Sequence, residues 1–276
     1  LQNTLSFKLN IMSQVLIFTP QMTKLRIVIS PAKTLDWTSE LPKRTYSRPN
    51  NIEQAGKLIE VLKKYSSQEI GQLMHISNDL SQLNYDRYQK WSLNHAKNTR
   101  PAMFAFAGDV YTGLDAYSME KKEIDFAQKN LRILSGLYGV LKPLDKIYPY
   151  RLEMGTKLPV EDKNNLYQFW GNTVVDTINE ELSEKDYLIN LASEEYFKVI
   201  PAKELKAQLI TPQFYEFKNG KYKVISFFAK KARGSMARFI IDQSINKVSE
   251  IKHFDIDGYS FNEPMSKGNT WVFTRG

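Results

Sequence analysis

The 276-residue chain contains no cysteine. Disulfide bonds, thiolate nucleophiles and cysteine-ligated zinc or iron–sulfur sites are therefore excluded. Histidine is scarce: the three histidines are His75, His95 and His253, and none has a neighbour at a spacing typical of metal ligands. The sequence also contains no Walker loop and no recognisable Ser-His-Asp arrangement. It therefore predicts no metal site and no cofactor.

Long apolar runs are absent as well. The longest near the start, residues 15–18, is far shorter than a membrane span. Residues 1–21 also lack the basic start and the small-residue cleavage site of a signal peptide. We therefore predict no membrane association. Because residues 1–21 show no periodicity and Met22 directly precedes a strand pattern, we expect them to be a dispensable non-core extension and residues 22–276 to form one domain.

Positive charge exceeds negative charge in this chain. The net charge is +8 and the isoelectric point is near 9.3. Hydrophobic residues make up 42% and charged residues 25%, which is typical of a globular protein. The basic excess favours an anionic partner without identifying it.

Strand and helix patterns alternate along the chain and predict a mixed α/β (α+β) fold, with one mixed sheet surrounded by helices. Asn219-Gly220 predicts a hairpin turn. Expected strands lie at residues 25–29, 102–107, 187–192, 209–217, 223–229 and 270–274. Expected helices lie at residues 51–65, 67–74, 77–88, 125–134 and 166–181, and after residue 234.

The glycine-rich stretch at residues 131–155 is the most distinctive segment of the chain. The expected helix at residues 125–134 runs directly into Gly136 and Gly139. A helix followed by Gly-x-x-Gly is typical of a helix-hairpin-helix, whose turn amides can face a phosphate. Alternatively, the two glycines only end a helix and let two backbones pack closely. Pro143 and Pro149 limit any second helix.

Polar loops are expected at the ends of four strands. Ligands of open α/β sheets bind beyond the carboxyl ends of the strands, so these loops could form one cleft. Alternatively, they are the ordinary polar loops that follow strands in most proteins. The candidate catalytic residues are Lys33, Asp109, Tyr111 and Glu195, and further residues expected in the cleft are Tyr150, Arg151, Glu153, Lys230 and Arg233.

A basic run surrounds the expected start of the last long helix. Lys230, Lys231 and Arg233 precede that start and Arg238 lies in the first turn. Cations at a helix N-terminus interact unfavourably with the helix dipole, and a bound anion would offset that cost. The alternative is exposed charge that is screened by salt.

Several segments, spread over residues 25–274, resemble the bacterial YaaA peroxide-stress family. Among them are SPAKTLDW (30–37), FAGDVYTGL (106–114), LRILSGLYGVLKPLD (131–145), PYRLEMG (149–155), LYQFWG (166–171), NLASEEYFK (190–198) and ISFFAKKARG (225–234). The resemblance implies a cytoplasmic protein needed under hydrogen peroxide stress that limits free iron and oxidative damage. It also implies a family-specific mixed α/β fold with a helix-hairpin-helix-like element and a positively charged cleft.

The sequence and the resemblance together favour binding of double-stranded DNA through its backbone phosphates. The expected phosphate-binding residues are Gly136, Gly139, Arg151, Lys230, Lys231, Arg233 and Arg238. The alternative function is an enzyme that acts on a nucleotide or a nucleic-acid base in the strand-end cleft. Clustered polar groups in a closed pocket would favour the enzyme, and a wide basic groove would favour DNA binding.

Overall fold

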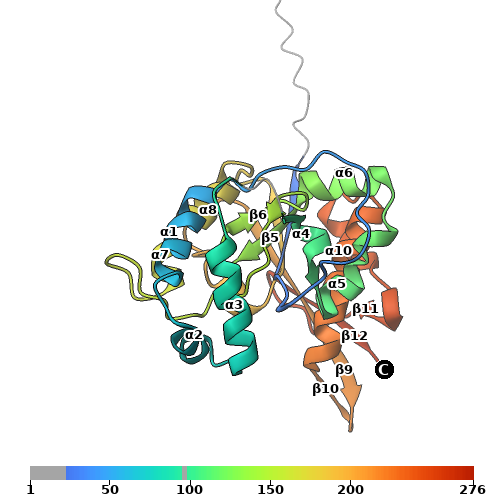
Figure 1. Cartoon of the computed structure of the whole chain (residues 1–276). Helices are drawn as coiled ribbons and strands as arrows, with labels where there is room; N and C mark the ends of the chain where they lie inside the picture. The colour runs from blue at the N-terminus through green and yellow to red at the C-terminus, as the bar shows by residue number, and fades with distance from the viewer. Residues whose placement is uncertain (1–22, 95–97) are drawn as a thin grey trace, which may run out of the picture.

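The computed structural model describes residues 23–94 and 98–276 (Figure 1). The predicted extension at residues 1–21 and the position of His95 lie outside the described residues. A mixed sheet of eight strands crosses the molecule in the order β11-β12-β9-β8-β1-β5-β6, with β10 paired to β9. Its strands are β1 Leu25–Ile29, β5 Leu131–Ser135, β6 Gly139–Leu141, β8 Tyr187–Leu191, β9 Gln208–Lys218, β10 Lys221–Lys223, β11 Ser260–Phe261 and β12 Thr270–Arg275.

The centre of the sheet is parallel and its margins are antiparallel. Strands β5, β1, β8, β9 and β12 are parallel neighbours, whereas β6, β10 and β11 pair antiparallel to β5, β9 and β12. All five residues of β1 are buried. Parallel strands covered on both faces have nearly continuous apolar sequences, and LRIVI in β1 fits that rule except at Arg26. The mixed α/β fold expected from the sequence is confirmed.

Helices cover the sheet from both sides. In Figure 1, α1, α7 and α8 lie on one side of β5 and β6, and α5, α6 and α10 lie on the other. The helices are α1 Ile52–Leu62, α2 Ser67–Met74, α3 Asn78–Lys90, α4 Ala102–Ala105, α5 Asp109–Leu114, α6 Lys121–Asn130, α7 Leu166–Trp170, α8 Thr173–Asn179, α9 Glu194–Phe197 and α10 Ser226–Asp242, with 3-10 turns at Ala116–Ser118, Val248–His253 and Ile256–Gly258. Two short ribbons pair β2 Thr34–Leu35 with β4 Phe106–Ala107, and β3 Arg100–Pro101 with β7 Lys146–Ile147.

Serine side chains begin several of these helices. Ser66 and Glu69 form a capping box at α2, Ser77 caps α3, and Ser193 caps α9. The expected helices at residues 51–65, 67–74 and 77–88 and the expected cap at Ser193 are therefore confirmed. The helix expected at residues 166–181 is broken into α7 and α8 at Gly171, whose φ of 46° lies in the left-handed region.

Three expectations for residues 102–134 and 223–229 are wrong. Helix α6 ends at Asn130, and the next five residues form β5, because they pair with β1 inside the sheet. Residues 102–105 are helical rather than extended, in accord with the helix propensity of their alanines. Strand β10 ends at Lys223 and α10 begins at Ser226, which buries Ala229, Ala232 and Met236 at helical spacing.

The helix-hairpin-helix predicted at Gly136 and Gly139 is also wrong. These glycines belong to the turn between the antiparallel strands β5 and β6, where Ser135 pairs with Gly139. A Cβ at Gly136 would collide with the Leu152 carbonyl oxygen. Gly139 has a φ of 68°, and a Cβ there would lie 2.8 Å from the Trp170 ring. Close packing and a left-handed backbone therefore require both glycines, as the alternative interpretation of close backbone packing held.

A shared carboxylate joins the two central strands. Arg26 on β1 and Arg132 on β5 are both buried, and both donate to Glu181, with Nε to carboxylate distances of 2.9 and 3.2 Å. Arg26 also donates to the Asn130 side chain at 2.9 Å. Burial raises the pKa of Glu181, but the two guanidinium groups outweigh burial and hold that pKa below its usual value. Glu181 thus compensates two charges that the sheet would otherwise bury unpaired.

Replacing Glu181 with Gln should lower the free energy of unfolding by about 3 kcal/mol, because both guanidinium groups lose their carboxylate. A lowered carboxyl pKa stabilises the fold above the unfolded-state pKa of about 4.3, and this contribution is lost as the pH falls through the folded pKa. The difference between wild type and variant should therefore shrink below about pH 4. Urea unfolding at several pH values measures it. The matched control is Glu180→Gln at the exposed neighbour; equal effects of the two substitutions would contradict the assignment.

Candidate functional site at the strand ends and on helix α10

The carboxyl ends of β1 and β8 meet through hydrogen bonds. The Ser193 backbone N–H donates to Ser30 Oγ at 2.8 Å. The Tyr111 hydroxyl, from α5, donates to the Ser30 carbonyl oxygen at 3.2 Å. Because β1 and β8 are parallel neighbours in register, the loops that follow them begin at the same edge of the sheet. Two of the four expected strand-end loops, those that follow β1 and β8, thus meet here, and Tyr111 reaches them from α5. Residues 230–233, expected to form another of these loops, lie inside α10.

The segment that follows the β5–β6 hairpin joins these loops. Glu153 accepts from Lys33 Nζ and Arg151 Nη2, both at 2.8 Å, and Gly155 N–H donates to Glu195 Oε1 at 3.0 Å. We call Lys33, Tyr111, Arg151, Glu153 and Glu195 the strand-end cluster. It contains three of the four predicted catalytic candidates.

Charge inside the strand-end cluster is balanced, since Lys33 and Arg151 both pair with Glu153 and Glu195 adds a second carboxylate. The pocket beside Lys33, Arg151 and Glu153 has a volume of about 10 Å³. A volume of that size holds about one water molecule. The observed cluster therefore has no room for a nucleotide and no unpaired cation for a phosphate.

Three buried tyrosines belong to the cluster or lie next to it. Burial raises the pKa values of Tyr111, Tyr150 and Tyr196 above the ordinary value for a phenol. The Tyr150 hydroxyl lies 2.6 Å from Ser135 Oγ in the β5–β6 hairpin. These phenols stay protonated near neutral pH, so they act as hydrogen-bonding groups rather than bases. The fourth catalytic candidate, Asp109, starts α5 and forms no ion pair with the described residues.

Helix α10 carries the other predicted cations and packs tightly on α5. A Cβ at Gly113 would collide with the Lys231 carbonyl oxygen, and a Cβ at Gly234 would collide with that of Val110. These two glycines therefore let the two helix backbones touch. The expectation that the basic run precedes its helix is wrong, because α10 begins four residues before Lys230.

Only part of the basic run is available to an anion. Lys231 pairs with Asp257 at 3.2 Å. Arg238 binds Asp242 and the Asp115 carbonyl oxygen and is thus structural. Lys230 is exposed, and Arg233 is half-buried with its pKa lowered by burial; neither has an acidic partner within residues 23–94 and 98–276.

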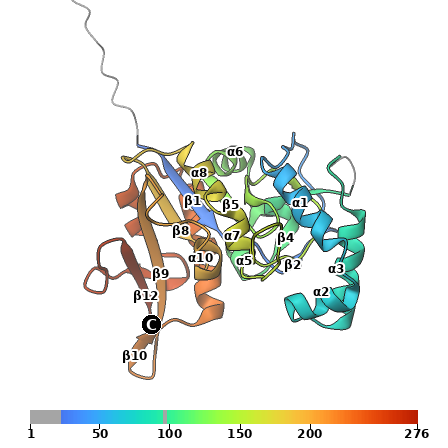
Figure 2. The ribbon, with the colours of Figure 1, turned by 90° about the vertical axis from the view of Figure 1, so that its left-hand side faces the viewer.

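The β9–β10 hairpin adds cations that the sequence interpretation missed. Lys218 and Lys221 are exposed and Lys223 is half-buried, and none of the three has an acidic partner in the described part of the chain. The hairpin projects from the body of the molecule in both views (Figures 1 and 2). A signal was present in the sequence: residues 217–241 contain five lysines and two arginines but no acidic residue.

The predicted phosphate contacts at Gly136 and Gly139 have no support. Both glycines are buried, and the Gly136 carbonyl oxygen accepts from Trp170 Nε1 at 3.0 Å. Arg151, which is paired to Glu153, is likewise not free. Of the seven predicted phosphate-binding residues, Lys230 and Arg233 keep a cation without a carboxylate partner in the described residues.

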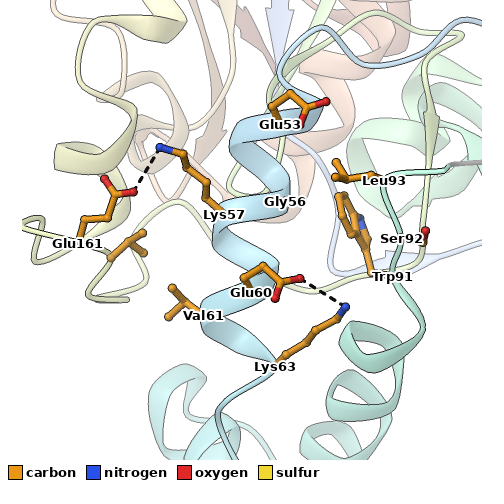
Figure 3. Close-up of a pocket in the computed structure, with 11 residues that line it drawn as sticks. Glu53, Gly56, Lys57, Glu60, Val61, Lys63, Trp91, Ser92, Leu93 and Glu161 are labelled. Carbon is orange, nitrogen blue, oxygen red and sulfur yellow. Dashed lines mark hydrogen bonds and ion pairs between the residues drawn. The ribbon is translucent and has the colours of Figure 1, made fainter.

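A wider groove lies elsewhere, between α1 and the segment that follows α3 (Figure 3). Its volume is about 690 Å³. Lys57 on α1 pairs with Glu161 at 3.2 Å, Lys63 pairs with Glu60 one turn earlier along α1 at 3.6 Å, and Glu53 adds a further negative charge. Because its charges are paired, this groove does not suit a phosphate backbone.

The described residues offer neither a metal-binding cluster nor a membrane-spanning helix. No group of three or more acidic or histidine side chains could hold a metal ion there. Within the same residues, no helix combines the length and the apolarity needed to cross a bilayer.

Comparison with known proteins assigns the chain to a family. The family model described as peroxide stress protein YaaA matches residues 25–265. The chain belongs to this YaaA family. It is 52% identical over 252 residues to a UPF0246 protein of Hahella chejuensis, covering 90% of this chain and 98% of the relative. UPF0246 proteins of Colwellia psychrerythraea and Aliivibrio fischeri strain MJ11 are 54% and 53% identical over the same length, with 90% of this chain covered and 98% and 97% of those relatives.

In this YaaA-family chain, Glu153→Gln should lower the free energy of unfolding by about 1 to 2 kcal/mol, because the half-buried Arg151 loses its carboxylate. Lys33→Ala should change it by less than about 0.5 kcal/mol, because the Lys33 side chain is 62% exposed. Urea unfolding of the two variants makes the comparison. A larger loss for Lys33→Ala would show that the salt bridge between Lys33 and Glu153, rather than the one between Arg151 and Glu153, secures the cluster.

Proposed function

We propose that this peroxide-stress protein binds duplex DNA through backbone phosphates and thereby limits iron-dependent oxidative damage to DNA. The observation that carries the proposal is the unbalanced charge of residues 217–241. Lys218, Lys221, Lys223 and Lys230 carry positive charge without an acidic partner among the described residues. Cations of this kind bind DNA by releasing the counterions condensed on its phosphates.

Counterion release also offers a physical link to iron. Ferrous ions are cations that associate with DNA phosphates, and lysines that neutralise those phosphates displace them. Hydroxyl radicals formed from peroxide and iron would then arise farther from the bases and sugars. A protein with this role acts where bacterial DNA lies, in the cytoplasm. No iron site on the protein is needed for this effect.

The strand-end enzyme is the weaker alternative. The loops that would form its active site do meet, as Ser30, Tyr111 and Ser193 show. However, the pocket of about 10 Å³ and the paired charges around Glu153 leave no space or free cation for a nucleotide. Substrate entry would require the segment that carries Arg151 and Glu153 to move. The exposed lysines therefore favour DNA binding.

Salt dependence of duplex binding tests the proposal. The logarithm of the binding constant should fall with the logarithm of salt concentration, with a slope of about −0.9 for each phosphate neutralised. Replacing Lys221, Lys223 and Lys230 by Ala should flatten the slope by about 2 to 3 and weaken all duplex sequences alike. Fluorescence anisotropy with two duplexes of unrelated sequence at several salt concentrations measures both effects.

The matched control replaces Lys64, Lys203 and Lys206, three exposed lysines outside α10 and the hairpin. It removes the same charge but should keep the wild-type slope, because these side chains lie away from the proposed contact. If both triple variants shift the slope equally, net charge alone governs binding and the hairpin is not the contact surface. A wild type that does not bind duplex DNA would refute the proposal.

A further inference from the structure

The projecting β9–β10 hairpin and the start of α10 expose an unusual number of aromatic rings. Phe217 is 50% exposed, Tyr222 38% and Phe227 57%, and Phe228 and Val224 are exposed as well. Single exposed apolar residues are common on protein surfaces, but five within 12 consecutive residues mark an interaction site. We call Phe217, Tyr222, Phe227 and Phe228 the hairpin aromatics.

The hairpin aromatics form two pairs with fixed geometry. Phe217 and Tyr222 face each other across the ribbon with ring centroids 5.2 Å apart. Phe227 and Phe228 have centroids 5.5 Å apart. The Arg275 guanidinium lies 4.6 Å from the Phe228 centroid.

Phe217 and Tyr222 lie on the ribbon, whereas Phe227 and Phe228 lie at the start of α10. Arg275 is held by Glu216 at 2.8 Å and places Phe228 on the Glu216 face. Since side chains alternate along a strand, Phe217 points to the opposite face. The Phe217–Tyr222 pair therefore lies on the face of the ribbon opposite to the one that Arg275 and Phe228 cover.

Charge surrounds these rings on the same elements. The tip is Lys218-Asn219-Gly220-Lys221, in which Asn219 and Gly220 have φ values of 54° and 74°, as a tight hairpin turn requires. Lys223 and Lys230 follow, and no acidic residue occurs between Phe217 and Ile241. Lysines thus alternate with flat rings along one projecting element.

We propose that this hairpin binds unpaired, single-stranded nucleic acid. Bases stack on the exposed rings of Phe217, Tyr222 and Phe227, while the surrounding lysines neutralise the phosphates between them. The proposal rests on the DNA binding proposed above and adds a contact to unpaired bases. A sequence-tolerant combination of aromatic platforms and backbone-neutralising cations is the chemistry that single strands require.

The charge pattern favours nucleic acid over a lipid surface. A hairpin that inserts into a bilayer leads with apolar residues, because a charged side chain in hydrocarbon is costly. Here the outermost residues are Lys218, Asn219, Gly220 and Lys221, and the rings lie behind them. This order of lysines at the tip and aromatic rings behind them suits a nucleic-acid strand, because the phosphates of such a strand lie outside its bases.

A pair of oligomers separates stacking from charge. One is an oligothymidylate of about 12 nucleotides, and the other is an abasic phosphodiester of the same length and charge. The full chain with Tyr222→Ala and Phe227→Ala should bind the oligothymidylate at least about tenfold more weakly than wild type. Its affinity for the abasic oligomer should stay within about twofold, because the lysines are unchanged.

Matched variants control for folding and for general apolarity. Tyr222→Phe with Phe227→Tyr keeps both rings and should retain wild-type affinity. Leu83→Ala with Leu93→Ala removes similarly exposed apolar side chains from other elements and should have no effect. Thermal unfolding of each variant verifies that the fold is intact.

Three outcomes would overturn the inference. The alanine variant loses affinity equally for both oligomers, it loses none for either, or wild type binds vesicles of anionic phospholipid and the alanine variant does not. Failure of the underlying DNA binding has a different signature, in which wild type binds neither oligomer and no duplex. Abasic binding without any preference for bases would leave the phosphate contact standing and remove the stacking role.

Discussion

The carboxylate of Glu181 is the contact on which the arrangement of the central strands depends. It lies between guanidinium groups of β1 and β5, and it comes from the segment that links α8 to β8. One half-buried carboxylate therefore links β1 and β5 to the segment that leads into β8. With these strands fixed, their carboxyl ends emerge side by side, and Ser30 can bind both Ser193 and Tyr111. Two buried arginines in adjacent strands would be unfavourable without that carboxylate.

The molecule separates its charge into balanced and unbalanced regions. At the strand ends, each cation meets a carboxylate, as Lys33 and Arg151 meet Glu153, and the enclosed space is small. On the β9–β10 hairpin and the start of α10, lysines remain without such partners while Glu216 is turned inward to Arg275 and Tyr259. Paired charge holds a structure together at low cost, whereas unpaired exposed charge remains free to meet a polyanion. This contrast moves the expected anion contact away from the strand-end cleft.

Local sequence signals correctly predicted those elements whose residue pattern fits only one kind of secondary structure. The apolar run of β1, the capping serines of α2 and α3 and the Asn219-Gly220 turn gave correct elements. The parallel-sheet rule brought the loops of Lys33 and Glu195 together, whereas Tyr111 reaches them from α5. Prediction failed where the residue pattern fits both a helix and a strand and pairing with distant strands decides between them. Residues 131–135 have apolar spacing that suits a helix, yet they lie between β1 and β6 as a strand. Partners distant in sequence, such as Asp257 for Lys231, could not be inferred at all.

Gly113 and Gly234 let two helices pack closely and thereby support the proposed nucleic-acid surface on α10 and the β9–β10 hairpin. Gly113 and Gly234 bring the backbones of α5 and α10 into contact, and α10 also packs on β9. The exposed end of α10 and the base of the hairpin are thereby held on a rigid support. Rings and lysines fixed in this way lose little conformational freedom on binding, which increases the affinity available from each contact. The positively charged surface is exposed and rests on a rigid support. These properties favour binding of an extended anionic ligand over catalysis in an enclosed pocket.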